Sequence, residues 1–132
     1  MARPPLLQIA PAELEVMKLL WSAGGLAARE IHDRLTEKTG WAYSTTRTVI
    51  ERLVKKSLIE KRAFHGLHVY EAAISRAQGM APLVKDFARN VLGLSHVPVA
   101  ALFRDSEALT PAEIDELREI LAATPSSGKG KR

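Results

Sequence analysis

The spacing of apolar residues changes once along this chain, and the change restricts the folds that are open to it. Up to about residue 56, apolar side chains recur every three or four positions, as on helices that bury one side. In LIEKRAFHGLHVYEAA, residues 58–73, β-forming residues instead surround His65-Gly66, which predicts a β-hairpin that turns there. Helices followed by a hairpin predict a mainly α chain with a winged helix-turn-helix domain.

Three helices are predicted before the hairpin. The first covers residues 11–22, where Pro11 suits the first helical turn, and the second covers residues 27–38. The third starts near Ser44, whose hydroxyl is a candidate cap for the free N–H groups of the first turn. One side of this third helix is apolar apart from a threonine, and it comprises Thr46, Val49, Ile50 and Leu53.

The third helix begins with AYSTTRT, residues 42–48, in which four of the five residues from Ser44 onward carry a hydroxyl group. Each such residue weakens a helix by roughly a few tenths of a kcal/mol, so contacts with a ligand explain them better than helix stability does. An α-helix fits the major groove of DNA with its first residues at the base edges, where Thr and Arg contact thymine, guanine and phosphate. The predicted DNA contacts are Ser44, Thr45, Arg47, Thr48, Arg52 and Lys55 on the helix, and Lys61, Arg62 and His65 on the hairpin.

Two alternatives stay open for this outward face. In the first, Ser44 caps the helix and the other polar side chains are only solvated. The second concerns Glu51, which lies within the same face and repels phosphate. Its carboxylate either accepts a hydrogen bond from a cytosine amino group or pairs with Arg47 or Lys55 at helical spacing.

Charge is unevenly distributed along the chain. Residues 41–62 carry six Lys or Arg against two Glu, whereas residues 78–124 carry four Lys or Arg against seven Asp or Glu. A positive excess confined to one segment indicates a polyanionic partner for that segment. A solvated basic face is the alternative that charge alone leaves open.

The remainder of the chain is also predicted to be helical, with one helix over residues 78–92 and another that starts at the capping sequence TPAE, residues 110–113. Helices of about 12 residues are marginal alone in water, so their apolar stripes need a partner surface, either the N-terminal domain or a second copy. Symmetric dimers are the commonest soluble oligomers, which favours a second copy. The expected dimer interface comprises Val84, Phe87, Val91, Leu92, Val99, Leu102, Phe103, Ile114, Leu117 and Leu121.

These predictions divide the chain into three parts. They are a winged-helix DNA-binding domain at residues 1–76, a helical dimerisation region at residues 77–123 and a disordered tail at residues 124–132. The tail, TPSSGKGKR, has the polar composition of segments that form no packed core.

Several classes of protein are disfavoured by the composition. The chain has no cysteine, which excludes disulfides and thiolate metal sites and favours a cytoplasmic protein. No apolar run approaches the roughly 20 residues of a membrane span, and the first residues lack the pattern of a secretory signal. The sequence shows no nucleophile–base pair, phosphate loop or carboxylate constellation, so we expect neither an enzyme nor a bound cofactor.

Two functions other than DNA-dependent repression remain as alternatives. One is a metal- or ligand-sensing winged-helix regulator, for which His65 and His68 on the hairpin form only a weak site, with Glu71 as the nearest carboxylate in the hairpin. The other is a protein-interaction module that uses the same fold without nucleic acid. The positive excess of residues 41–62 disfavours this second alternative.

Four separated blocks resemble the penicillinase-repressor family, the BlaI/MecI/CopY type of transcriptional regulator. They are AELEVMKLLW, AREIHDRL, WAYSTTRTVIERLVKKSLIEK and LTPAEIDELREIL, and the resemblance covers about residues 8–122. It implies a winged-helix repressor that forms a homodimer through its C-terminal helices and binds a palindromic operator. The family's DNA contacts carry over to Thr45, Arg47 and Thr48.

The chain departs from the family pattern at three places. Ser57 stands where glycine is usual, so we expect a tight or strained turn into the hairpin. The cysteine cluster of copper-sensing members is missing, which excludes thiolate copper sensing. The bond between Leu102 and Phe103 aligns with an Asn-Phe bond that a sensor-linked protease cuts in antibiotic-responsive members. Only the phenylalanine is kept, and the resemblance therefore leaves open cleavage there by a membrane sensor protease as the inducing step.

Overall fold

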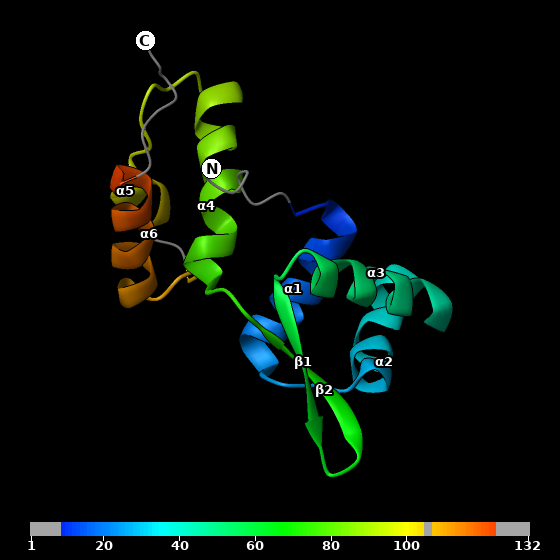
Figure 1. Cartoon of the computed structure of the whole chain (residues 1–132). Helices are drawn as coiled ribbons and strands as arrows, with labels where there is room; N and C mark the ends of the chain where they lie inside the picture. The colour runs from blue at the N-terminus through cyan, green and yellow to red at the C-terminus, as the bar shows by residue number, and fades with distance from the viewer. Residues whose placement is uncertain (1–8, 105–106, 124–132) are drawn as a thin grey trace. The chain divides into compact units, whose positions relative to one another are not determined.

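The computed structural model of the chain describes residues 9–104 and 107–123 and divides into two compact units (Figure 1). The predicted tail, residues 124–132, lies outside the described residues. The first unit comprises α1 (Pro11–Ala23), α2 (Ala28–Thr39), α3 (Tyr43–Lys55), β1 (Ile59–Phe64) and β2 (Leu67–Ala72). The second unit comprises α4 (Arg76–Asn90), α5 (Val99–Phe103) and α6 (Pro111–Ala123).

This architecture confirms the predicted fold class. Three helices and an antiparallel hairpin form a winged helix-turn-helix, and a helical region follows. Within the described residues, no helix has both the length and the apolar character that crossing a membrane requires.

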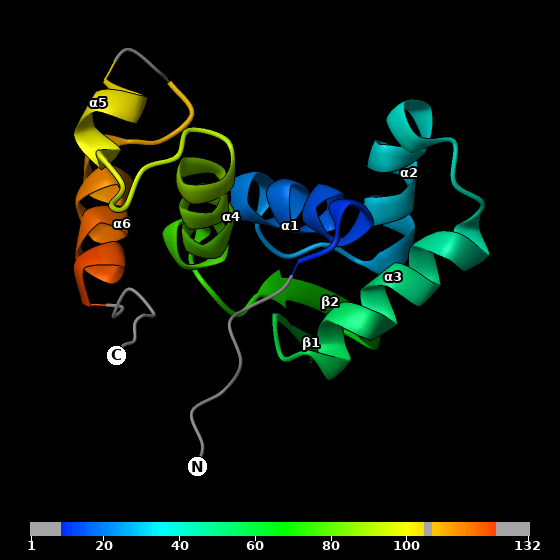
Figure 2. The same ribbon diagram turned by 90° about the horizontal axis from the view of Figure 1, so that it is seen from above.

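The core of the first unit forms where the inner sides of its three helices meet the hairpin (Figure 2). A fully buried side chain of this kind contributes roughly 1.5–3 kcal/mol, so the core holds α3 firmly against the other two helices. Its main members are Val16, Met17 and Leu20 from α1, Ile31 and Leu35 from α2, Val49, Ile50 and Leu53 from α3, and Tyr70 from β2.

The hairpin turns where the sequence predicts. His65 and Gly66 form its two-residue loop, with positive φ angles of 51° and 81°. Positive φ at both loop positions is the type I′ conformation, whose twist suits a two-residue hairpin. Leu26 forms a further antiparallel bridge to Tyr70, with backbone N–O distances of 3.0 and 2.8 Å. The hairpin is thereby tied to the segment between α1 and α2.

An alanine precedes each of the first two helices, and the glutamate three positions later accepts a hydrogen bond from the backbone N–H of that alanine. The backbone N–H of Ala10 donates to the carboxylate of Glu13 at 2.9 Å, and that of Ala27 donates to Glu30 at 2.8 Å. This is the glutamate half of a capping box. The carboxylates therefore stabilise the starts of α1 and α2 without a capping hydroxyl.

The third helix starts after Ala42, so the prediction that Ser44 caps it is wrong. Ala42 has the extended backbone of a cap residue, with φ −72° and ψ 159°. Its carbonyl accepts the backbone N–H groups of Thr45 and Thr46 at 3.0 and 3.1 Å. Ser44 is the second residue of the helix, and its side chain is exposed.

Ser57 leaves α3 in the left-handed region, with a φ of 63°. This conformation favours glycine because the Cβ of other residues crowds the neighbouring carbonyl. The strain expected where the family pattern has glycine is therefore present at this turn.

In the second unit, α4 packs along α6, and the short α5 lies against α6 (Figure 1). α6 begins as predicted, since Thr110 and Glu113 exchange hydrogen bonds of 2.9 and 3.1 Å in a full capping box. Three of the six buried core residues are on α4, where two alanines allow close helix packing. The core comprises Ala77, Ala81, Val84, Val99, Leu109 and Leu117.

Candidate nucleic-acid interface

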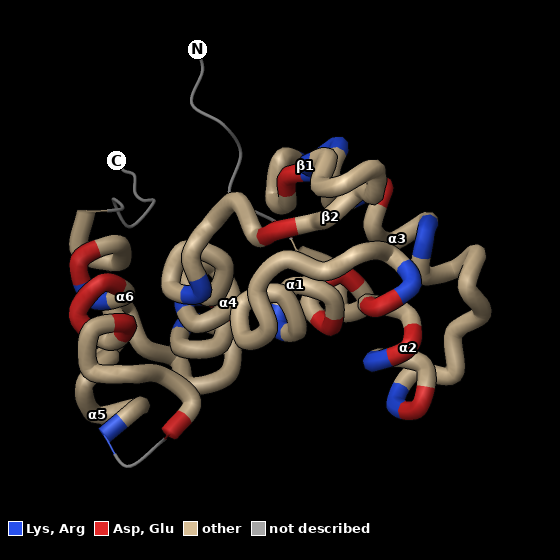
Figure 3. The backbone as a smooth tube through the Cα atoms, turned by 90° about the horizontal axis from the view of Figure 1, so that it is seen from below, with Lys and Arg blue, Asp and Glu red and all other residues tan. Residues whose placement is uncertain are grey.

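The outward side of α3 collects polar and cationic side chains, opposite the side that enters the core. All six helix residues predicted to contact DNA are exposed, and the threonine expected to pack inward, Thr46, is fully buried. Figure 3 shows Lys and Arg positions in blue on α3 and on the hairpin. The helix thus presents one continuous face that comprises Ser44, Thr45, Arg47, Thr48, Arg52 and Lys55.

The later part of this face surrounds a surface hollow of about 410 Å³, lined by Arg47, Thr48, Glu51, Arg52 and Lys55. Three of these five side chains are cationic. Glu51 pairs with Arg47 at 3.3 Å, the helical pairing left open by the sequence. Both partners are nearly half exposed, and exposed pairs contribute roughly 0–1 kcal/mol. Arg47 can therefore readily exchange Glu51 for another anion.

The surroundings of Arg47 favour its charged form. Interaction with the Tyr43 side chain is the first cause that raises the pKa of Arg47, and the nearby Glu51 carboxylate acts in the same direction. The guanidinium is therefore charged before any ligand arrives.

The first turn of α3 is fixed against α2 by a cluster that the sequence did not reveal. The Nδ1 of His32 and the buried Oγ1 of Thr46 are hydrogen-bonded at 2.8 Å. The Tyr43 ring stands edge-on to His32 with centroids 5.4 Å apart, and the guanidinium of Arg29 lies 3.9 Å from the Tyr43 ring centre. The sequence could have indicated this cluster only if the cap had been assigned to Ala42, because that assignment places Tyr43 in the first turn of α3.

A buried carboxylate links α1 to the end of α3. Glu13 is only 1% exposed, yet its Oε1 accepts from the Lys56 Nζ at 2.7 Å and its Oε2 lies 3.7 Å from the Arg52 Nε. Burial raises the pKa of Glu13, but hydrogen bonds from Lys56 and Ala10 and the two positive charges outweigh it. The net result is a lowered pKa. Arg52 is thereby drawn partly toward α1.

The hairpin residues predicted to contact DNA are exposed but point in different directions. Lys61 and Arg62 are successive residues of β1, so their side chains leave opposite faces of the hairpin. The Arg62 Nη1 donates to both carboxylate oxygens of Glu71 at 3.1 and 3.0 Å. His65 occupies the turn and stacks edge-on with Phe64, with ring centroids 4.3 Å apart.

Metal binding receives no support from the described part of the chain. Within it, no three His, Cys, Asp or Glu side chains converge in a way that would hold a metal ion.

The residues expected at a dimer interface divide into three groups. Val84, Val99 and Leu117 are buried within the second unit of a single chain. Phe87 on α4 is 47% exposed, and Val91 and Leu92, which follow the end of α4, are 67% and 44% exposed. The half-buried remainder comprises Leu102, Phe103, Ile114 and Leu121.

Leu102 and Phe103 form the last turn of α5 and pack partly against the core of the second unit. A protease that binds an extended substrate therefore requires this turn to open before it can reach the bond between them.

Comparison with known proteins places these features in context. The family model described as "Penicillinase repressor" matches residues 9–123. The chain is 29% identical over 114 residues to the methicillin resistance regulatory protein MecI of Mammaliicoccus sciuri, which covers 86% of this chain and 93% of that protein. It is also 29% identical to the penicillinase repressor of Staphylococcus aureus, with 86% and 90% covered.

Two solved structures resemble part of the chain. The DNA-binding domain of the repressor BlaI matches with a TM-score of 0.51 and 29% identity, covering 58% of this chain and 93% of that one. Bacillus licheniformis BlaI in its monomeric form, solved in complex with the blaP half-operator, matches with a TM-score of 0.50 and 30% identity, covering 55% and 89%.

Proposed function

Since the chain belongs to the penicillinase repressor family, we propose that it is a DNA-binding transcriptional repressor. It binds a palindromic operator as a homodimer and is released by an inducing signal. The observation that carries the proposal is the exposed polar face of α3, which is held outward by the buried opposite side of the same helix. In this proposal the protein acts in the cytoplasm, where the operator lies.

The first turns of α3 enter the major groove. Thr45 and Thr48 offer a methyl group for thymine and a hydroxyl for bases or phosphate, and Arg47 offers a forked donor for guanine. The exposed pair between Arg47 and Glu51 is weak enough to open for such a contact. Half-buried Glu51 then remains beside Arg47. Its negative charge repels phosphate there, and its carboxylate accepts a hydrogen bond from the amino group of cytosine.

The remaining Lys and Arg side chains and the His65 imidazole contact the sugar-phosphate backbone on either side of the groove. Lys55 continues the outward face of α3, and Lys61 and His65 extend along the hairpin to its tip. Arg62 joins them when its bond to Glu71 opens. Such contacts position a protein on duplex DNA and contribute most of its salt-dependent affinity.

Homodimerisation uses the second unit. The exposed Phe87 lies in the last turn of α4, and the exposed Val91 follows the end of that helix, where its backbone N–H donates to the Phe87 carbonyl at 2.9 Å. The two side chains form an apolar strip that water does not favour. A twofold dimer places two copies of α3 at equivalent positions, and palindromic half-sites roughly 34 Å apart, or a multiple of that distance, match such a pair.

Release of the repressor follows from damage to this second unit. Cleavage between Leu102 and Phe103, by a sensor-linked protease, separates α6 from α4 in sequence while Leu117 of α6 belongs to their shared core. Loss of that core dissociates the dimer, so the two copies no longer bind the two half-sites of the operator together.

A binding measurement tests the proposal. The purified full chain is titrated into a labelled duplex from its own upstream region, at several salt concentrations. We expect tight binding. The logarithm of the association constant should fall linearly with the logarithm of the salt concentration, with a slope of about −0.9 for each phosphate neutralised. Equal affinity for the upstream duplex and for random duplex of the same length would contradict the proposal, and so would binding that ignores salt.

A further inference from the structure

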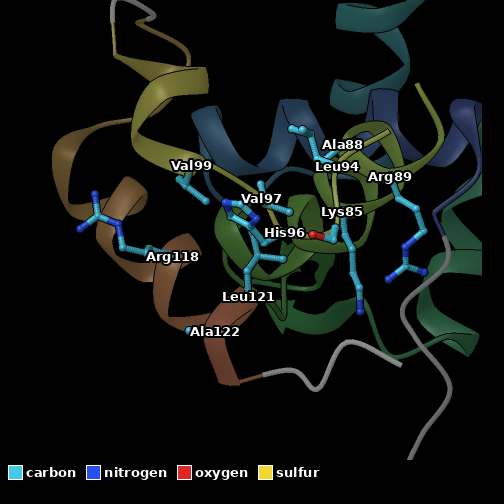
Figure 4. Close-up of a pocket in the computed structure, with 11 residues that line it drawn as sticks. Lys85, Ala88, Arg89, Leu94, His96, Val97, Val99, Arg118, Leu121 and Ala122 are labelled. Carbon is cyan, nitrogen blue, oxygen red and sulfur yellow. The ribbon is translucent and has the colours of Figure 1, made fainter. Parts of the chain in front are cut away.

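The second unit contains a cavity of about 400 Å³ between α4, α6 and the segment that follows α4 (Figure 4). Small-molecule sites in proteins occupy roughly 300–1,000 Å³, so the cavity is large enough for an organic ligand of modest size. Nothing proposed above for DNA binding uses it.

Cationic side chains gather at this cavity although residues 76–123 are acidic overall. Residues 76–123 contain five Lys or Arg and seven Asp or Glu. Three of the five cations, Lys85, Arg89 and Arg118, line the cavity, and no carboxylate is among its lining residues. The positive charge is therefore local and does not reflect the composition of residues 76–123.

Two of these cations are arranged to act together. Lys85 and Arg89 are one turn apart on α4, and Figure 4 shows both side chains extending in the same direction. Within the described part of the chain, neither forms an ion pair with a carboxylate. Arg118 extends to the opposite side in Figure 4 and lies 3.9 Å from Asp115, so we assign it no contact. The imidazole of His96 projects between these two sides.

The rest of the lining is apolar. Leu94 and Val97 come from the segment after α4, and Leu121 comes from α6. All three are half-buried, so they present apolar surface to the cavity that a ligand can remove from water. The lining thus combines a cationic side with an apolar side.

The cavity is distinct from the strip assigned to the dimer. At 3.6 residues per turn, Phe87 points roughly 160° away from both Lys85 and Arg89 around the axis of α4. A second copy seated on Phe87 and Val91 therefore approaches α4 from the other side.

From this geometry we infer that the cavity binds an amphipathic organic anion. Its carboxylate, or another anionic group, is held by Lys85 and Arg89, with His96 beside it. Its aromatic or branched aliphatic body rests against Leu94, Val97 and Leu121. This inference concerns binding to the second unit alone and holds whether or not the first unit binds DNA.

Three probes with one apolar body separate charge recognition from burial of apolar surface. They are naphthylacetate, its neutral amide naphthylacetamide, and the cation naphthylmethylamine. Each is titrated into the full chain by calorimetry, and the site is located by NMR from shifts of the His96 ring signals. We expect naphthylacetate to bind at least roughly tenfold more tightly than the other two, since a charge-assisted hydrogen bond is lost in each. Equal affinities, or no naphthylacetate binding at about 1 mM, would overturn the inference.

Variants assign the binding to these residues. Lys85→Gln and Arg89→Gln should each weaken naphthylacetate binding roughly tenfold, whereas Arg104→Gln, which removes an exposed cation outside the cavity, should not. Ala122 is exposed and lines the cavity, so Ala122→Glu should weaken binding by repulsion while Ala122→Gln should not. Equal effects of Arg104→Gln and Arg89→Gln, or shifts at Phe87 in place of His96, would overturn the assignment.

Discussion

The Nζ of Lys56 donates to the Oε1 of Glu13 across 2.7 Å and so ties the residue that ends α3 to the first turn of α1. Glu13 also accepts the N–H that starts α1. One carboxylate therefore stabilises a helix start and the attachment of the helix proposed to enter DNA.

This carboxylate makes stability depend on pH. Its folded-state pKa is lowered from the ordinary 4.5, so its contribution is fully present above that value and is lost as the pH falls through the folded pKa. Glu13→Gln should lower the free energy of unfolding at pH 7 by about 1–2 kcal/mol. The difference from the unchanged protein should shrink from about pH 4.5 downward.

Urea unfolding at a series of pH values measures both effects. Glu37→Gln is the control because Glu37 is exposed and forms no ion pair with the other described residues; it should behave like the unchanged protein at every pH. A constant difference between the Glu13→Gln variant and the unchanged protein down to pH 3 would show that ionisation of Glu13 is not the source of stability.

Ser57→Gly should stabilise the protein. The left-handed φ of 63° costs a residue with a side chain roughly 1–2 kcal/mol, and the greater freedom of glycine when unfolded offsets part of the gain. We expect a net increase of about 0.5–1 kcal/mol. The same change at Ser22, in the last turn of α1, should instead destabilise by up to about 0.5 kcal/mol. A loss of stability for Ser57→Gly would mean that the serine side chain itself supports the turn.

Glu71→Gln should strengthen DNA binding. In the free protein Glu71 holds both of its oxygens within 3.1 Å of Arg62, and the amide releases this cation for phosphate. The salt slope of binding should steepen by about 0.9, the contribution of one further phosphate contact. Glu60→Gln removes an equal charge from the same hairpin without freeing Arg62, so an equal steepening in both variants would indicate a general charge effect.

Phe87→Asp should produce monomers. The side chain is 47% exposed on α4, so a charge there is tolerated in a single chain but not in an apolar contact between copies. Sedimentation velocity at micromolar concentration should show a dimer for the unchanged protein and for Asn90→Asp, which adds the same charge to the exposed end of α4. A monomeric unchanged protein would contradict the proposed dimer.

Periodicity and turn chemistry were sufficient to predict the elements of this fold. The inner side of α3, from Val49 to Leu53, was readable because a helix repeats every 3.6 residues. The hairpin turn was readable because His65-Gly66 interrupts a run of β-forming residues, and the capping box of Thr110 is a local signal. Such features depend on neighbours in the sequence.

Interactions between distant residues were not predictable in this way. Glu13 was interpreted as a charge at a helix start, and only the packing of α1 on α3 shows that it is buried beneath Lys56. The bond that occupies Arg62 likewise depends on the pairing of two strands, which brings Glu71 beside it.

The central claim, that the outward face of α3 reads base sequence, is tested most directly at Thr48. Its hydroxyl donates only to the Ser44 carbonyl at 3.0 Å, and alanine favours helix more than threonine does, so Thr48→Ala leaves the fold intact. Thr48→Ser, which keeps the hydroxyl, shows whether the methyl group or the hydroxyl is read.

The measurement is fluorescence anisotropy with the upstream duplex and with random duplex of equal length, at one salt concentration. We predict that Thr48→Ala weakens binding to the upstream duplex by roughly 5- to 150-fold, the range for one base contact of about 1–3 kcal/mol, and leaves binding to random duplex unchanged. An equal loss on both duplexes, or no loss on either, would contradict the account.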